Sequence, residues 1–183
     1  MKLTYMTAQR WWNVKSIEGE YWLTSLVSYN CVWKPREPFV ADCLKGGYAV
    51  SSRPVHPPPE VVPVWGCVCG IYSSREGTNK DWSLGESILS VYGAVASWGK
   101  VIQHAEGFRA QYAYPQALDY VRLSKVCHCC AQTDQTKTYR LAFSGSVFSA
   151  CEPCFGDSFG SIKMEFEIDD VSSVLEQLRE KYL

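Results

Sequence analysis

The chain has 183 residues, of which 46% are hydrophobic and 20% charged, and its formal net charge is −1. This composition indicates a globular protein and argues against a disordered one, and the length suits one substantial domain or two small ones. The first residues hold no apolar run of signal-peptide length, and no stretch approaches the ~20 apolar residues of a membrane helix, so we expect a soluble, cytoplasmic protein.

Two strands joined by a tight turn are predicted at the aromatic-rich start of the chain. Apolar and polar residues alternate loosely from Trp11 to Ile17 and from Tyr21 to Val27, as they do in half-buried strands. The turn would be formed by Glu18-Gly19-Glu20. The residues from Thr24 to Tyr29 also fit a short helix.

A long, proline-rich loop follows. Seven prolines and a Gly-Gly pair lie between Lys34 and Pro63, so little regular structure is expected there. Loops of such length are uncommon in a compact domain unless something holds them. A zinc ion could hold this one. Its candidate ligands are three thiols and one imidazole, namely Cys43, His56, Cys67 and Cys69. The alternative is a buried Cys43 and an exposed His56, with only the last two cysteines close together.

The middle of the chain has two interpretations. Residues 83–95 fit a helix that begins with a capping box. We favour instead a long strand from Ser90 to His104, kinked at its two glycines, and paired through a glycine turn with a strand from Phe108 to Tyr114. The alternation of the second segment after that turn is typical of a hairpin. A short helical turn is expected from Gln116 to Ser124.

A strand followed by a helix is predicted at the C-terminal end. Apolar residues alternate with charged ones from Ile162 to Ile168, which indicates a strand with one wet face. Asp169 and Asp170 then cap a helix from Val171 to Tyr182, whose apolar residues follow the i, i+3, i+4, i+7 rule. We expect this helix to pack on a sheet.

Two CxxC pairs separated by twenty residues predict a tetrahedral zinc site. Its ligands are Cys127, Cys130, Cys151 and Cys154. The chain has nine cysteines, an odd number that cannot all pair in disulfides, which also favours metal-bound thiolates in a reducing compartment. A closed shell of four thiolates leaves no open position for a substrate, so a structural role is expected. Residues Thr136 to Phe143, between the pairs, are predicted to form a hairpin, as in zinc ribbons.

A longer pattern surrounds the upstream cysteines. The stretches Cys67-x-Cys-Gly-Ile-Tyr72, Gly93-x-Val-x-x-Trp-Gly99-x-Val101 and Gly107-x-Arg-Ala110-x-x-Ala113-x-Pro115 resemble the signature of a family of small uncharacterised proteins from bacteria and their phages. The resemblance covers roughly residues 10 to 120. In that family an Ala-x-Cys and a His-x-Pro, here Ala41-Asp-Cys43 and His56-Pro-Pro58, precede the first of these stretches. The resemblance therefore implies that Cys43, His56, Cys67 and Cys69 act as one set, because all four fall on the signature, and it implies no biochemical activity.

Charge and motifs limit the classes of function. Residues 1–70 carry +2, residues 71–126 carry +1 and residues 127–183 carry −4. A zinc module that binds nucleic acid normally presents a basic face, and the zinc-bearing part here is acidic, which favours a protein partner. The chain has no phosphate-binding glycine loop and no zinc-deaminase motif, so we expect no enzymatic activity.

We therefore predict a mainly β protein of the α+β class. Residues 1–126 would form a small twisted sheet or partly open barrel, and residues 127–183 a zinc-ribbon-like unit with a closing strand and helix. The predicted function is a non-enzymatic zinc-binding interaction or adaptor module that binds another protein. The alternative is a nucleic-acid-binding regulatory protein whose paired Trp and basic residues stack bases, namely Arg10-Trp-Trp12, Trp33-Lys34 and Trp98-Gly-Lys100. A metal-dependent enzyme would require one of the four upstream residues not to be a ligand.

Overall fold

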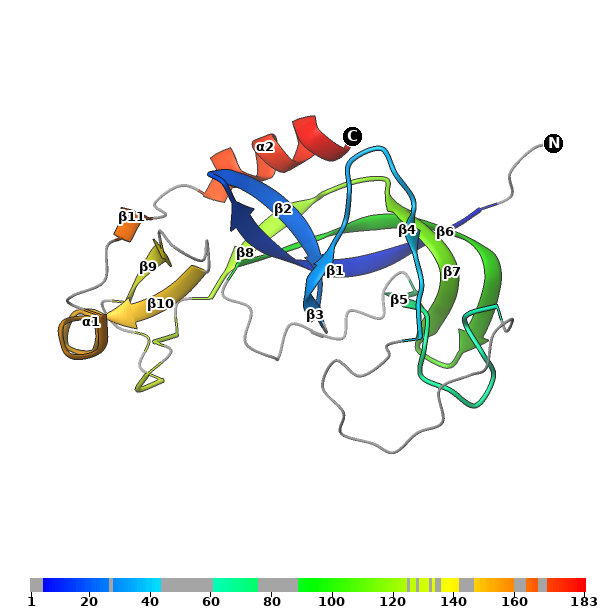
Figure 1. Cartoon of the computed structure of the whole chain (residues 1–183), viewed down its shortest axis with the longest axis horizontal. Coiled ribbons are helices and arrows are strands. Elements are labelled where there is room, and N and C mark those ends of the chain that lie inside the picture. Colours follow the sequence, from blue (N-terminus) through cyan, green and yellow to red (C-terminus); the bar gives the residue numbers. More distant parts are fainter. Residues whose placement is uncertain are drawn as a thin grey trace.

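The computed structural model shows two antiparallel sheets, a large one and a three-stranded one at the opposite end of the molecule (Figure 1). It describes residues 5–26, 28–43, 61–75, 89–124, 126–127, 129–131, 133, 136–141, 147–159, 164–167 and 171–183. Within these residues the chain is mainly β and ends in a helix, which confirms the predicted fold class.

The larger sheet curls into a ring. Its strands are β1 (Met6–Ile17), β2 (Glu20–Ser25), β3 (Ser28–Val32), β4 (Phe39–Val40), β5 (Ile71–Ser74), β6 (Leu89–His104), β7 (Gly107–Pro115) and β8 (Tyr120–Leu123). β1 pairs with β6, β6 with β7 and β7 with β5, and β5 returns to β1 where Gln9 lies opposite Ser74. β2 and β3 extend the sheet beyond β1, while β4 and β8 add to β7 and β6. The partly open barrel expected from the sequence is confirmed.

Two glycines let the long strand β6 curl. A Cβ atom on Gly93 would clash with the carbonyl oxygen of Ala117, so the chain that follows β7 can cross the strand only at a glycine. Gly99 has a φ of +76° and lies in a bulge between Trp98 and Val101, where the register with β7 shifts. The predicted glycine-interrupted strand and its hairpin with β7 are confirmed.

Two expectations about helices differ from the structure. The helical turn predicted for residues 116–124 is wrong, because β8 pairs there with the start of β6. Its side chains alternate with period two, since Val121 and Leu123 pack against the core and Tyr120 is exposed. The helix considered from Thr24 to Tyr29 is also wrong, because the end of β2 and the start of β3 occupy those positions that are described. Residues 76–88 lie outside the described part, so the proposed capping box is not tested.

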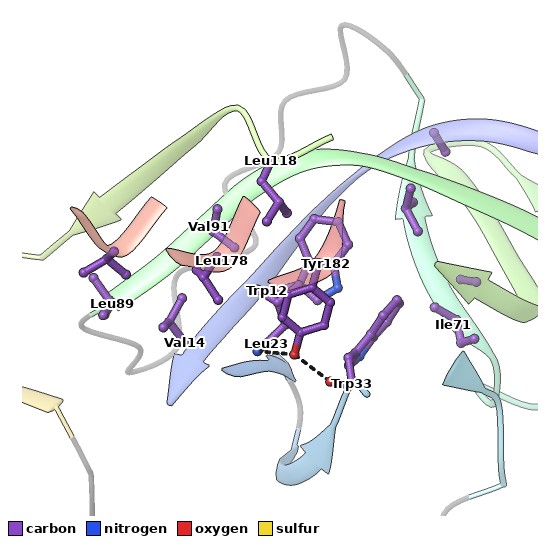
Figure 2. Close-up of a cluster of buried hydrophobic side chains, with 14 residues drawn as sticks. Trp12, Val14, Leu23, Trp33, Ile71, Leu89, Val91, Leu118, Leu178 and Tyr182 are labelled. Atoms are coloured by element: carbon purple, nitrogen blue, oxygen red, sulfur yellow. Dashed lines mark hydrogen bonds between the residues drawn. The ribbon is translucent and has the colours of Figure 1, made fainter. Parts of the chain in front are cut away.

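The C-terminal helix α2 (Val171–Tyr182) packs on the larger sheet. Its buried residues Val174, Leu178 and Tyr182 join the core cluster around Trp12 (Figure 2). The predicted helix and its packing on a sheet are confirmed. The sequence predicts that this helix belongs to the unit of residues 127–183. Its apolar face lies instead in the core of the larger sheet. The boundary between residues 126 and 127 stays a prediction.

The hydroxyl group of Tyr182 is inserted between two strands of that core. The Leu23 N–H on β2 donates to the hydroxyl oxygen at 3.1 Å, and the hydroxyl donates to the Trp33 carbonyl oxygen at 2.6 Å (Figure 2). The second hydrogen bond between the same two residues is direct, because the Trp33 N–H donates to the Leu23 carbonyl oxygen at 2.8 Å. Burial raises the pKa of Tyr182 to about 12, so the hydroxyl keeps its proton at neutral pH.

A Tyr182→Phe variant should be less stable than the native protein by about 2 kcal/mol, because a buried N–H and a buried carbonyl would lose their shared partner. Urea unfolding followed by tryptophan fluorescence measures this difference. Tyr21→Phe is the matched control, because no hydrogen bond of the Tyr21 hydroxyl is recorded within the described residues, and it should change stability by less than about 0.5 kcal/mol. Equal stability of the two variants would contradict the role assigned to the Tyr182 hydroxyl.

Candidate metal centres

The C-terminal cysteine quartet surrounds a β-hairpin. β9 (Thr136–Leu141) and β10 (Val147–Cys151) are antiparallel, and β11 (Met164–Glu167) lies on the other side of β9. A hairpin between the two CxxC pairs is thus confirmed, but its predicted range, Thr136 to Phe143, holds only the first strand, and the second strand lies beyond it. Cys127 and Cys130 lie in a turn before the hairpin. The Ala131 N–H closes this turn by donating to the Cys127 carbonyl oxygen at 2.9 Å.

The second CxxC pair begins a helix. Cys151 is the last residue of β10, and Cys154 lies in the first turn of α1 (Glu152–Phe159). The helix continues through Gly156 and ends at Phe159. An acidic residue and a proline in the first turn, Glu152 and Pro153, both favour the start of a helix at this point.

The four thiols lie close enough together to hold one metal ion. Their sulfur atoms all lie within 4.8 Å of one another, and those of Cys130 and Cys151 are 3.6 Å apart. Four thiolates bound tetrahedrally at about 2.3 Å from an ion such as zinc would place their sulfurs about 3.8 Å apart. Cys127 and Cys151 are buried, while Cys130 is exposed at the edge of the site. These four residues could hold a metal ion as predicted.

Backbone N–H groups prepare one of these thiols for binding. Hydrogen bonds from the backbone of Cys151, and then of Cys130 and Cys129, lower the pKa of Cys127 to about 6. The pKa of Cys154 is raised, first because its thiol shares hydrogen bonds with Cys151 and Cys130. A metal ion is bound by thiolates, so its binding would displace the protons that such thiols share.

Three of the four predicted upstream ligands come together in the structure. The sulfurs of Cys43, Cys67 and Cys69 lie within 4.8 Å of one another, with 4.0 Å between those of Cys43 and Cys67. Burial raises the pKa of Cys69, while the Val64 N–H, 3.3 Å from its sulfur, acts in the opposite direction. The alternative in which Cys43 lies apart from the other two is wrong. His56 lies outside the described residues, and its place in the set stays a prediction.

Side chains of the larger sheet bind all three carbonyl groups of residues 67–69. Arg109 on β7 donates from Nη1 to the carbonyl oxygen of Cys67 and, at 3.1 Å, to that of Cys69. The Tyr72 hydroxyl on β5 donates to the Val68 carbonyl oxygen at 2.7 Å. Neither residue was predicted to belong to the centre, although both fall on the signature that contains the cysteines.

No family model, curated protein or solved structure matches this chain. In the part of the chain that the structure describes, no helix combines the length and the apolar character needed to cross a membrane.

Most of the residues considered for base stacking are buried. Arg10, Trp11, Trp12 and Trp33 have at most 8% of their surface exposed. The Arg10 guanidinium lies 5.2 Å from the centre of the Trp33 ring and donates to the Tyr72 carbonyl oxygen. The tryptophans of two of the three groups are therefore committed to the core, although Lys34 beside Trp33 is exposed. The third keeps a half-buried Trp98, stacked on Tyr112 at 5.9 Å between ring centres.

Proposed function

We propose that this protein is a non-enzymatic zinc-binding module that binds another protein. The observation that carries the proposal is the exposed apolar tip of the loop that contains Cys67 and Cys69. Its three large apolar residues, Val61, Trp65 and Val68, are 48%, 77% and 59% exposed. We refer to these three residues as the knuckle tip.

Zinc is the proposed ion because sets of cysteine thiolates in tetrahedral arrangement suit it. A quartet of sulfurs with no fifth ligand position supports a structural role, in which the ion stabilises a small hairpin and helix. We propose that one zinc ion binds at the C-terminal quartet. A second ion is proposed for Cys43, Cys67 and Cys69, with His56 as the fourth ligand.

The knuckle tip has the properties of a protein-binding surface. Single exposed apolar residues are ordinary, but three of them within eight residues of one loop form a patch that is better explained by a partner. Tryptophan is also among the residues that contribute most to protein interfaces. The loop is supported from below, since Lys100 on β6 donates from Nζ to the Val61 carbonyl oxygen at 3.1 Å. This contact links the loop that carries the patch to β6.

The test compares two exposed aromatic residues. Zinc-loaded protein is used to capture partners from its host, and the affinity of the captured protein is then measured for Trp65→Ala and for Tyr5→Ala, whose ring is 53% exposed. We expect Trp65→Ala to weaken binding by at least about 30-fold, the effect of losing an interface hot spot, and Tyr5→Ala to leave it unchanged.

Two outcomes would contradict the proposal. Unchanged affinity of the Trp65→Ala variant would remove the knuckle tip as the binding surface. Tight binding of single-stranded or duplex oligonucleotides that weakens steeply with salt would favour the nucleic-acid alternative.

A further inference from the structure

We infer that Arg109 and Tyr72 are positioning residues that preform the upstream metal centre. Together they bind every carbonyl of the Cys67–Cys69 segment and so hold both thiols toward Cys43. This inference rests on the proposed binding of a metal ion at the three thiols.

The contacts divide the segment between two side chains. One guanidinium takes the carbonyl oxygens of the two cysteines, and one hydroxyl takes that of the residue between them. A backbone bound at three successive carbonyls has little freedom to rotate its peptide planes. The direction of each Cα–Cβ bond is then set as well, which leaves rotation about that bond as the one torsion that places each sulfur.

The sheet determines where the two side chains lie. Tyr72 and Arg109 are directly opposite each other in the pairing of β5 with β7, and the guanidinium lies 5.9 Å from the centre of the tyrosine ring. Both residues therefore start from a rigid support, and each limits the movement of the other. Positioning groups act best when they stand on regular strands rather than on loops.

Gly70 explains how the segment can approach β7 so closely. Its φ is +118°, and a Cβ atom there would lie 3.0 Å from the Pro63 Cβ and 3.1 Å from the Arg109 Cβ. A side chain at this position would push the segment away from the strand. The carbonyl oxygens of Cys67 and Cys69 would then move out of reach of the guanidinium.

Charge gives Arg109 a second effect on the centre. Three thiolates and one divalent cation together carry a net charge of −1. The arginine cation, bound to the backbone of two of the ligands, offsets that charge in a partly buried place. Groups that orient metal ligands from outside the ligand shell typically change metal affinity by 10- to 100-fold when they are removed.

The experiment uses the full chain with cobalt(II), whose bonds to thiolates absorb light, in competition with a chelator. The part of the cobalt absorbance that disappears in the Cys43→Ser variant identifies the binding step of the upstream centre. The binding step of the C-terminal quartet serves as an internal reference. We expect Arg109→Gln to weaken the upstream step by 10- to 100-fold and Tyr72→Phe by about 10-fold, with the quartet unaffected. Lys34→Gln, which removes an exposed positive charge in the loop between β3 and β4, should have no effect.

The outcomes are distinguishable. Weakening by both variants, with the quartet and the melting temperature retained, supports the inference. Native affinity in both variants would overturn it while leaving the proposed metal centre intact. If Arg109→Gln does not fold, Tyr72→Phe alone decides, because it removes one hydrogen bond and no charge. A native protein that takes up only one ion would overturn the upstream centre and this inference together.

Discussion

The Cys151→Ser variant is expected to lose one metal ion per chain and to unfold the small C-terminal unit, while the larger sheet stays folded. Cys151 is 4% exposed, and its sulfur lies 3.6 Å from that of Cys130. A structural zinc ion contributes about 10 to 16 kcal/mol of apparent binding free energy in small zinc-binding peptides. That exceeds what three short strands and an eight-residue helix can supply by packing.

Three measurements follow the two parts of the molecule separately. Elemental analysis counts the metal, and limited proteolysis should cut the variant within residues 127–167, the part that precedes α2. All seven tryptophans precede residue 127, so tryptophan fluorescence reports on the part of the chain before it and should not change.

The neighbouring cysteine provides a matched control. Cys129 lies in the same turn as Cys127 and Cys130, but it is exposed and does not belong to the quartet. We expect Cys129→Ser to keep both the metal and the resistance to protease. Full metal content in Cys151→Ser, or loss of metal in Cys129→Ser, would contradict the assignment of the four ligands.

The parts of the fold that the sequence predicts are those encoded locally. The hairpin of β6 and β7 follows from alternation on both sides of a glycine turn, and the helix α2 from its apolar spacing. The C-terminal quartet follows from the two CxxC pairs, because each pair brings its own thiols together. In each case the pattern that decides the structure is a short one, although the two CxxC pairs themselves are twenty residues apart.

Features that depend on distant segments could not be predicted in this way. The ring closes through a pairing of Gln9 with Ser74, which cannot be predicted from the sequence around either residue. The strand β8 forms because the edge of β6 is free beside it, although the segment itself was expected to turn as a helix. Arg109 meets Cys67 and Cys69 across about forty residues of chain. Such contacts are set by the packing of the whole sheet.

Arg10 shows how tertiary packing can overrule an expectation based on residue type. Arginine is rarely buried, so its place beside two tryptophans suggested a surface for nucleic acid. In β1, however, alternation places Arg10 on the same face as the core residues Ala8 and Trp12. Burial lowers the pKa of Arg10 to about 10, and its charge is accommodated by the Trp33 ring and a backbone carbonyl.

Replacing Leu178 by alanine should destabilise the larger sheet by about 3 to 5 kcal/mol. The side chain is fully buried, with 0% of its surface exposed, and it packs beside Trp12 and Val91 (Figure 2). Truncation of such a leucine removes its transfer free energy and leaves a cavity. The loss is a large share of the roughly 5 to 15 kcal/mol by which a domain is stable. Urea unfolding followed by tryptophan fluorescence measures it.

The same variant tests which of the two sheets the C-terminal helix stabilises. Glu176→Ala, on the exposed side of α2, is the control and should change stability by less than about 0.5 kcal/mol. Because Leu178 lies in the core of the larger sheet, its loss should lower the midpoint of tryptophan unfolding while the quartet keeps its metal. The opposite result, with metal lost and the tryptophan transition unchanged, would show that the helix stabilises residues 127–167 instead. Arg179 Nε donates to the Leu118 carbonyl oxygen at 2.8 Å, a second link between the helix and the strands before residue 127 that favours the first result.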